Sequence, residues 1–337
     1  MLASKNRLGM TSSVLFLSHD PHEVHSAFAQ SVGAREYCTG LKKYVALTKK
    51  IPWTGHFFAP YSFVYSLFIK VPEDILLIDG GASVYIALGL KWRKPGLKII
   101  YLDGDTMFHS VRNAKPYQQY LAAKLLKNID AVISVSEQNQ SQVTIDAPGA
   151  VCPPFPKAVV ATNSPHKSCG LYVGRLDPDK NIRQIIAFGL QCPDFETFVV
   201  VGDGVLRPEI EKMAQANPKL QYKGFVTDVA SYYNTCSFLI HLPDYDPHPT
   251  VTMEAALCGC FPIMSPGTGS NYLFDPLFTA PDPADFAALN KKIAYIQKHN
   301  HAVSLLLKES IDKIPTRESS VAHFTHSFTQ LAKQLRS

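Results

Sequence analysis

The chain has 337 residues, of which 46% are hydrophobic and 18% charged, and its net charge is +5. This length is typical of two domains, and this composition excludes an intrinsically disordered chain. No apolar run reaches the length of a membrane-spanning helix. The seven cysteines form no CxxC motif, so we expect neither a disulfide framework nor a zinc site, and we predict a reduced, cytoplasmic protein.

The excess positive charge lies in the first half of the chain. Residues 1–150 hold 16 Lys and Arg against 11 Asp and Glu, whereas residues 151–337 hold 17 of each. Within the first half, the aromatic segment WTGHFFAPYSFVYSLFIK follows four lysines, namely Lys42, Lys43, Lys49 and Lys50. Basic residues beside such a segment favour peripheral docking on the inner face of an anionic membrane. The alternative is that the segment packs against the first sheet. No nucleic-acid partner is expected.

In chain order, buried strands alternate with amphipathic helices. The first half contains strand patterns at 13–18, 74–81, 98–105 and 131–137, with a helical pattern at 117–128. A segment rich in Pro and small residues at 150–170 is the predicted linker. The second half contains strand patterns at 169–175, 197–204, 220–226, 237–243 and 261–265, separated by helical patterns. Such alternation predicts α/β domains with doubly wound parallel sheets.

We predict two Rossmann-like domains that face a central cleft. The first spans residues 1–155, the second spans 165–315, and a C-terminal helix at 316–337 crosses back to the first domain. Ligands of parallel sheets bind at the carboxyl ends of the strands.

Four features follow successive strands of the second domain. Gly174 and Arg175 follow the first strand, with Lys180 shortly after, and Gly202-Asp203-Gly204 follows the second. The segment Lys223-Gly224-Phe225-Val226 ends the third. The fourth feature is a helix that starts near Pro249 within DPHPTVTME. An arginine fork, a lysine and a helix N-terminus at one sheet edge suit a diphosphate, because each favours negative charge.

The order and spacing of these segments resemble the retaining GT-B glycosyltransferases of family 4. GRLDPDK matches the G-R-x4-K element of that family, and DPHPTVTME matches its E-x7-E element, with Asp246 in place of the first Glu. The resemblance extends from about Gly170 to about Ile296. It implies a GT-B fold and transfer of a hexose, with retention, from a nucleoside-diphosphate sugar to a glycan or lipid-linked acceptor. The sugar nucleotide is a co-substrate, so no cofactor and no metal are expected.

The resemblance also implies roles for particular residues. Arg175 and Lys180 would stabilise the leaving diphosphate, Asp246 would orient the sugar, and Glu254 would accept the ribose hydroxyls. His109 is a candidate for contact with the transferred sugar. The remaining predicted donor-binding residues are Gly174, Gly202, Gly204, Phe225, Val226, His248, Thr250 and Val251.

Several departures from the family leave alternatives open. Asp246 is one methylene shorter than Glu, and Pro249 lacks a backbone donor, which Thr250 would replace with its hydroxyl. These departures favour a catalytically weak subunit that acts through a partner. Where the family has a glycine-rich loop, this chain has SHDPHEVH, so His19, His22 or His25 is a candidate contact.

Asp103 and Asp105 form a D-x-D motif, which is typical of metal-dependent GT-A glycosyltransferases. We interpret it instead as an acidic loop. A nicotinamide oxidoreductase is disfavoured, because no G-x-G-x-x-G follows the first strand. For Glu254, the structural alternative is a buried helix in which it pairs with Arg or Lys.

Overall fold

The structure is a computed structural model that describes residues 14–19, 22–41, 55–162 and 167–337. The chain forms two compact units. Unit 1 comprises Met1–Pro154 and Arg317–Ser337, and unit 2 comprises Phe155–Thr316. The described part of the chain contains no helix that combines the length and apolar character needed to cross a membrane.

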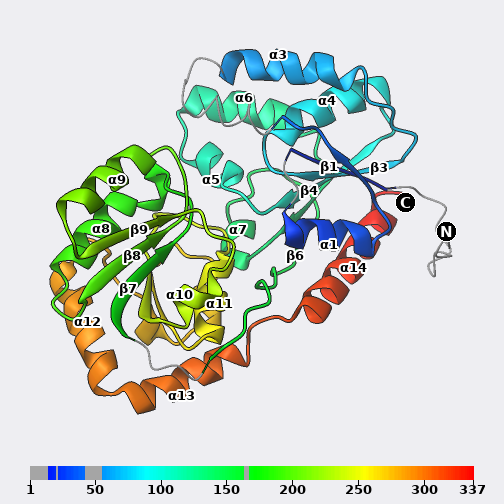
Figure 1. The fold of residues 1–337 in the computed structure, drawn as a ribbon. Coiled ribbons are helices and arrows are strands. Elements are labelled where there is room, and N and C mark those ends of the chain that lie inside the picture. The colour runs from blue at the N-terminus through cyan, green and yellow to red at the C-terminus, as the bar shows by residue number, and fades with distance from the viewer. Residues whose placement is uncertain (1–13, 20–21, 42–54, 163–166) are drawn as a thin grey trace. The chain divides into compact units, whose positions relative to one another are not determined.

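Unit 1 is built on a six-stranded parallel sheet with the strand order β2-β1-β3-β4-β5-β6 (Figure 1). Its strands are β1 (Val14–Ser18), β2 (Arg35–Cys38), β3 (Ile75–Asp79), β4 (Lys98–Asp103), β5 (Ala131–Ser134) and β6 (Gly149–Val151). Its helices are α1 (Glu23–Ser31), α3 (Gly55–Ser66), α4 (Ser83–Arg93), α5 (Met107–Arg112), α6 (Pro116–Leu126), α7 (Glu137–Gln140) and α14 (Arg317–Gln334). Parallel strands require crossover connections, and helices supply them here.

Unit 2 contains a five-stranded parallel sheet with the order β11-β10-β7-β8-β9. Its strands are β7 (Lys167–Val173), β8 (Thr197–Val201), β9 (Leu220–Gly224), β10 (Cys236–His241) and β11 (Phe261–Met264). Its helices are η2 (Pro178–Lys180), α8 (Ile182–Gln191), α9 (Arg207–Ala216), α10 (Ala230–Tyr233), α11 (Thr250–Leu257), η3 (Asn271–Leu273), η4 (Pro276–Phe278), α12 (Phe286–Lys298) and α13 (Asn300–Ile311). The predicted α/β class with two parallel sheets is confirmed.

The central strands are apolar on both faces because helices cover both faces of each sheet. In unit 2, Phe198, Phe238 and Ile240 join one core with α8 and α12. The intervening residues, such as Leu171 and Leu239, join a second core on the opposite face with α11. Alternate residues of a strand therefore belong to different cores, as expected for a strand whose two faces are both buried.

The C-terminal helix belongs to unit 1. Phe324 of α14 stacks on Phe28 of α1, with ring centroids 4.5 Å apart. The Thr325 hydroxyl donates to Oγ of Ser31 at 2.9 Å. The C-terminal helix therefore packs against α1 and forms part of the same unit as the first 154 residues.

Several elements differ from the prediction. β2 was missed because its sequence, REYC, is mostly exposed and shows no apolar alternation. The segment SHDPHEVH was treated as a loop, but α1 begins within it at Glu23. The predicted linker at 150–170 overlaps the end of β6 and the start of β7. The four lysines at positions 42, 43, 49 and 50 lie outside the described residues.

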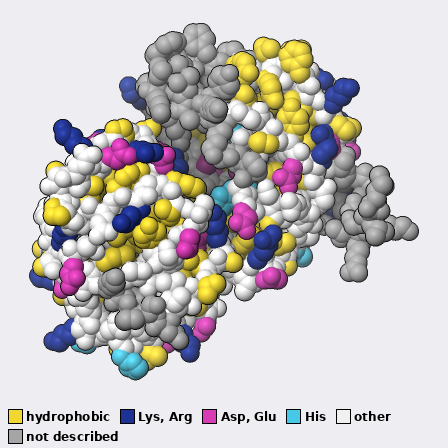
Figure 2. All heavy atoms as spheres, in the orientation of Figure 1, with side chains coloured by type: hydrophobic (Ala, Val, Ile, Leu, Met, Phe, Trp, Pro, Cys, Tyr) yellow, Lys and Arg dark blue, Asp and Glu magenta, His cyan; other side chains and the backbone are white. Residues whose placement is uncertain are grey.

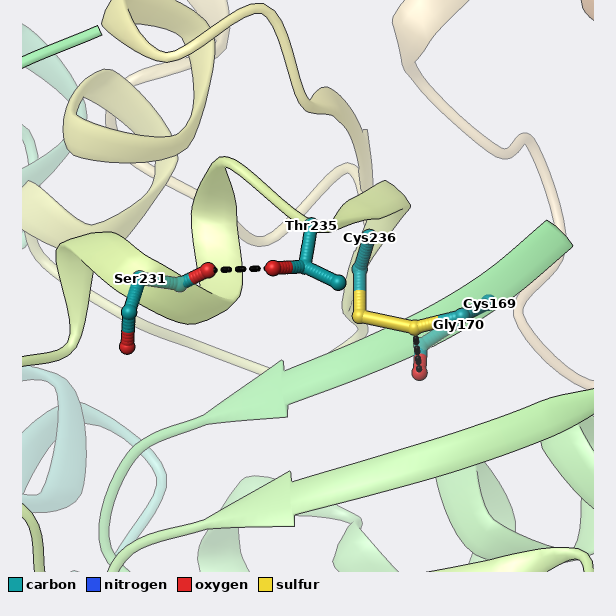
Figure 3. The surroundings of a disulfide bond; sticks show 5 residues. All are labelled: Cys169, Gly170, Ser231, Thr235 and Cys236. Atoms are coloured by element: carbon teal, nitrogen blue, oxygen red, sulfur yellow. Dashed lines mark hydrogen bonds between the residues drawn. A yellow bond between two sulfur atoms is a disulfide. The ribbon is translucent and has the colours of Figure 1, made fainter. Parts of the chain in front are cut away.

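The expectation that all cysteines are reduced is wrong for Cys169 and Cys236, which form a disulfide (Figure 3). They lie 67 positions apart in the sequence. Because β7 and β10 are neighbours in the sheet, the two Cα atoms come within 4.8 Å. Next to Cys236, the Thr235 hydroxyl donates to the Ser231 carbonyl at 2.6 Å (Figure 3). The spacing of cysteines in the sequence does not reveal this pair, because the order of the strands in the sheet brings the two residues together.

Candidate functional site

The loops after β7, β8 and β9 are joined to one another at the carboxyl edge of the unit 2 sheet. The Gly202 amide donates to the Gly224 carbonyl at 2.8 Å, and the Leu176 amide donates to the Asp203 carbonyl at 3.0 Å. These bonds form a continuous backbone layer from strands that are far apart in the sequence. The carboxyl edge of a parallel sheet is where such folds bind ligands.

The glycines of this layer are required by packing between the loops. Gly202 has a φ of +142°, and a Cβ there would lie 1.8 Å from the Gly174 carbonyl oxygen. A Cβ on Gly204 would lie 2.6 Å from the Leu176 nitrogen. Neither position accepts a side chain without moving backbone. Close approach to a ligand, predicted for Gly174, Gly202 and Gly204, remains a prediction.

Arg175 lies at the surface, immediately after β7. Its guanidinium contacts Asp177 and lies 3.5 Å from an oxygen of Asp179. About half of the Arg175 side chain is exposed. Exposed ion pairs are weak because water and salt screen them. An anion can therefore replace Asp179 at little cost, whereas Asp177 is only 14% exposed.

Lys180 is far less exposed, and its charge is already matched. Its Nζ lies 2.7 Å from Oδ2 of Asp246, and only 12% and 13% of the two side chains are exposed. Nε2 of His241, at the end of β10, lies 3.3 Å from the same oxygen. Asn181 has a φ of +53°, and its side chain donates to the Leu242 carbonyl at 3.1 Å. This bond ties the end of η2 to the loop after β10.

The environment of Asp246 holds its carboxylate ionised. Burial alone raises the pKa of Asp246, but the interaction with His241 and the charge of Lys180 outweigh burial. The resulting pKa lies well below the usual range of an aspartic acid. A buried carboxylate that stays charged can accept hydrogen bonds from neutral hydroxyls.

Helix α11 starts next to this cluster in the sequence. Pro249 is its N-cap, with φ −69° and ψ 122°, which agrees with a helix that starts near Pro249. The first helical residues, Thr250 and Val251, are partly buried. The imidazole of His248 is buried, which lowers its pKa to about 4, and Nε2 lies 3.3 Å from the Tyr272 hydroxyl. His248 is therefore neutral near pH 7.

Glu254 is buried in α11 and is bound by protein donors. The Tyr233 hydroxyl donates to its Oε2 at 3.2 Å, and the backbone amide of Lys157 donates to its Oε1 at 3.3 Å. These partners differ from the Arg or Lys of the structural alternative. Each oxygen has a further lone pair, so contact with ribose hydroxyls remains a prediction. Tyr233 was missed because its link to Glu254 depends on the packing of α10 against α11.

The remaining predicted donor residues differ in exposure. Phe225 is 77% exposed, directly after β9. Val226 is partly buried and packs against the core that lies under α11. Phe225 is thus free to contact a flat ligand, whereas Val226 contributes mainly to packing.

The D-x-D motif of unit 1 is engaged in local structure. Oδ2 of Asp105 accepts a hydrogen bond from the Gly81 amide at 2.7 Å. Its Oδ1 accepts from the Tyr101 hydroxyl at 2.8 Å and from the Met107 amide at 2.9 Å. Asp105 therefore holds the turn that leads into α5, whose N-cap is Thr106. Three protein donors on one carboxylate disfavour its use as a metal ligand.

Asp103 is fully buried at the end of β4. The Ser134 hydroxyl donates to its Oδ2 at 3.1 Å. Burial, followed by the charge of Asp105, raises the pKa of Asp103 to about 8. His109, the other predicted residue of this region, lies in α5 with its ring within 3.3 Å of the Asn113 amide.

A histidine–carboxylate pair in unit 1 was only partly foreseen. Nδ1 of His25 donates to Oδ1 of Asp79 at 2.9 Å, and both side chains are largely buried. Burial lowers the pKa of His25, but the charges of Asp79 and Asp105 outweigh it and the pKa is raised. His25 was a candidate because it lies in SHDPHEVH. Asp79 could have been identified as a candidate from its position at the end of a predicted strand, directly before Gly80 and Gly81.

Residues 168–294 match the family of glycosyl transferases group 1. HepE from Anabaena, solved with UDP and glucose, is similar over 96% of this chain and 100% of its own, with 15% identity and a TM-score of 0.71. Sucrose-phosphate synthase from Thermosynechococcus elongatus has 16% identity, coverages of 96% and 99%, and a TM-score of 0.72. No curated protein matches this sequence.

A third similar structure is the N-terminal domain of trehalose-6-phosphate phosphatase from Candida albicans. It has 11% identity, 98% coverage of both chains and a TM-score of 0.67. Its name is that of a different activity, so the fold alone does not decide the chemistry. The predicted resemblance and the predicted GT-B fold are confirmed, and the chemistry has to be argued from the site.

Proposed function

We propose that this protein is a glycosyltransferase that uses a nucleoside-diphosphate sugar as its donor. The observation that carries the proposal is the cluster of Lys180, His241 and Asp246. GRLDPDK supplies the lysine and DPHPTVTME supplies the aspartate, and both segments lie within the residues that match the glycosyltransferase family. HepE, which shares the fold, was solved with UDP and glucose.

In this proposal the donor diphosphate binds at the carboxyl edge of the unit 2 sheet. Arg175, which is itself half exposed, exchanges its carboxylate partners for phosphate oxygens. Lys180 reaches the diphosphate while Asp246 remains beside it. The N-terminus of α11 adds amide donors and a positive dipole end. Together these groups stabilise the charge that develops on the leaving diphosphate.

Asp246 then acts on the sugar rather than on the phosphate. Its ionised carboxylate accepts hydrogen bonds from sugar hydroxyls and holds the ring in one orientation. Lys180 and His241 keep it charged despite its burial. A shorter side chain than the family's Glu still carries out this role if the loop after β10 brings it close to the sugar.

We further propose that a hexose is transferred with retention to a glycan or lipid-linked acceptor, without a divalent metal. The bond between C1 and the phosphate oxygen breaks, and the electron pair leaves with the diphosphate. The acceptor oxygen forms its bond to C1 on the same face, and its proton passes to the departing phosphate oxygen. In place of a metal, Arg175, Lys180 and a helix N-terminus offset part of the diphosphate charge, although Lys180 also remains paired with Asp246.

The test starts with a panel of nucleoside-diphosphate sugars, ranked by the shift they cause in the melting temperature of the full chain. The best donor is then incubated with the purified protein, and NMR follows the anomeric proton of the released or transferred sugar. Retention predicts that the first product has the anomeric configuration of the donor. The opposite configuration would contradict retention but would leave glycosyl transfer standing.

A second candidate function is a catalytically weak subunit that acts through a partner. The departures at Asp246 and Pro249 favour it. This candidate predicts that the protein binds a donor but neither hydrolyses nor transfers its sugar alone. Turnover by the purified chain would exclude it.

A further inference from the structure

In helix α3 of unit 1, several large apolar side chains are exposed to solvent while small polar side chains are buried. Five large apolar residues of α3 and the following turn are exposed, namely Tyr61, Phe63, Val64, Leu67 and Phe68, whereas Tyr65 is partly buried and Ile69 is buried. Ser62 and Ser66, which are small and polar, are fully buried instead. A helix on a protein surface in water normally directs its apolar side chains inward. The arrangement therefore has a cause other than the folding of unit 1.

The buried side of α3 is small because α3 lies very close to α4. A Cβ on Gly89 of α4 would lie 2.0 Å from Oγ of Ser66. Small residues at a helix–helix contact allow the two backbones to approach closely. Cδ2 of Phe63 would lie 3.2 Å from the same Cβ position, so small side chains and one ring edge fill this contact, and Val64, Leu67 and Phe68 are exposed.

Trp92 of α4 extends the exposed surface. Its ring centroid lies 5.9 Å from that of Phe63, and the side chain is 69% exposed. Phe68, after the end of α3, is 80% exposed. Figure 2 shows hydrophobic side chains gathered at the top of the view, over the α3 and α4 part of unit 1. We call Tyr61, Phe63, Val64, Leu67, Phe68 and Trp92 the α3 face.

Positive charge borders the α3 face. Residues 55–72, which include α3, contain one lysine and no acidic residue. This lysine, Lys70, is exposed. The Arg93 guanidinium donates to the carbonyls of Ser66 at 2.9 Å and Ile69 at 2.8 Å, which places it at the C-terminal end of α3. Exposed apolar side chains with a cationic border match an anionic lipid surface.

The nearest acidic residues in the sequence do not cancel this charge. Glu73 is buried and bound by Arg35. Asp74 lies 3.0 Å from Nζ of Lys94. Each carboxylate is already paired with another cation, so neither offsets the charge of Lys70 or Arg93.

We propose that the α3 face docks unit 1 on the surface of an anionic lipid bilayer. Helix α3 spans Gly55–Ser66, 12 residues, which is too short to cross a bilayer but long enough to lie in its interface. A second copy of this chain fits the face less well, because a symmetric contact would bring two cationic borders together. The proposal does not depend on the activity assigned to unit 2.

Vesicle sedimentation of the full chain tests the proposal. We expect binding to vesicles that contain phosphatidylglycerol, weaker binding at high salt, and little binding to pure phosphatidylcholine. Replacing two exposed apolar residues, Leu67→Ser with Phe68→Ser, should lower the partition coefficient by about tenfold or more. The matched control is Tyr295→Ser with Leu305→Ser, which changes an exposed tyrosine and leucine of unit 2 and should leave binding unchanged.

A spectroscopic measurement assigns the docking face. The chain has two tryptophans, so Trp53→Phe leaves Trp92 as the reporter. Brominated lipids should quench Trp92, and its emission should shift to the blue on anionic vesicles. Absence of binding, equal binding by the Leu67/Phe68 variant, or an unresponsive Trp92 would each overturn the proposal. So would a dimer in lipid-free solution that the same variant dissociates, because the occupant would then be a second copy.

Discussion

Asp246 of unit 2 and Asp103 of unit 1 both lie after apolar strands, at the carboxyl edge of a parallel sheet, and both are largely buried. Asp246 lies beside Lys180 and His241, which hold its pKa well below the usual range. Asp103 accepts a hydrogen bond from Ser134, and no cation contacts it among the described residues, so its pKa rises to about 8. Two similar strand ends thus hold opposite charge states.

A carboxylate at a strand end therefore takes its charge state from its neighbours in space rather than from its sequence motif. The partner of Asp246 lies 66 positions earlier in the sequence. The D-x-D motif around Asp103 is the stronger local pattern, yet it serves a buried turn and the start of α5. Environment decides which acid is ionised and therefore which can bind a polar ligand in its charged form.

The largest expected effect is that of Lys180→Ala. Turnover should fall by about a hundredfold or more, because a cation beside the leaving group is lost. The fold should also lose about 3 kcal/mol of stability, since Asp246 is left buried with only His241 beside it. Steady-state rates and urea unfolding measure the two effects.

A double variant separates the two effects of Lys180. Lys180→Met combined with Asp246→Asn should recover much of the stability but none of the turnover. Arg175→Ala is the exposed counterpart, and it should lower turnover while leaving the urea midpoint nearly unchanged. Near-normal rates in both Lys180→Ala and Arg175→Ala would contradict the diphosphate role.

Glu254→Ala should weaken binding of the donor nucleotide by about 1.5–3 kcal/mol, if this carboxylate binds the ribose as proposed. The variant also leaves the buried Tyr233 hydroxyl without its acceptor, so a moderate loss of stability is expected. Tyr233→Phe is the control, because it removes that hydroxyl and keeps the carboxylate. Calorimetric titration should find a normal affinity in Tyr233→Phe. Equal affinities in both variants would make Glu254 purely structural.

The pH dependence of stability should carry opposite signs for the two aspartates. Burial raises the pKa of folded Asp103 to about 8, so the folded state binds more protons than the unfolded state between about pH 4 and pH 8, and stability falls as pH rises. Asp246 has a depressed pKa in the folded state, so its contribution is present above the unfolded value and is lost as pH falls below it.

Asp103→Asn isolates the first of these effects. The variant should be more stable than the parent at pH 8, and the gain should shrink toward pH 6. Urea midpoints measured across this range give the comparison, and the titration of His248 cancels because parent and variant both contain it. A gain that does not change with pH would mean that Asp103 is ionised throughout.

The smallest expected effect is that of metal removal. Turnover should survive exhaustive chelation, because Lys180, Arg175 and the N-terminus of α11 are proposed to neutralise the diphosphate. Asp105→Asn should lower the melting temperature, since Asp105 accepts bonds from Gly81, Tyr101 and Met107. Activity that is lost on chelation, restored by manganese or magnesium, and absent in Asp105→Asn would instead establish a metal site at the D-x-D motif.

Most strands, the helices between them and the parallel arrangement of the sheets could be predicted from sequence patterns. Short apolar runs bounded by Gly, Asp and Pro predict strands, and the helices between them require the strands to be parallel. The order of GRLDPDK, VVVGDG, YKGFV and DPHPTVTME along the chain was enough to identify the family that residues 168–294 match. These patterns are local in the sequence, so they can be interpreted without knowing which strands are neighbours in the sheet.

Only the tertiary structure decided which side chains meet. Sheet order brings Cys169 to Cys236 and Lys180 to Asp246, and the packing of α1 brings His25 to Asp79. The same packing buries Ser62 and Ser66 of α3 and leaves Phe68 exposed, although the aromatic residues of this segment suggested a buried element equally well. Charge state, disulfide pairing and the exposed face of a helix depend on distance and burial in three dimensions, and local sequence patterns carry neither quantity.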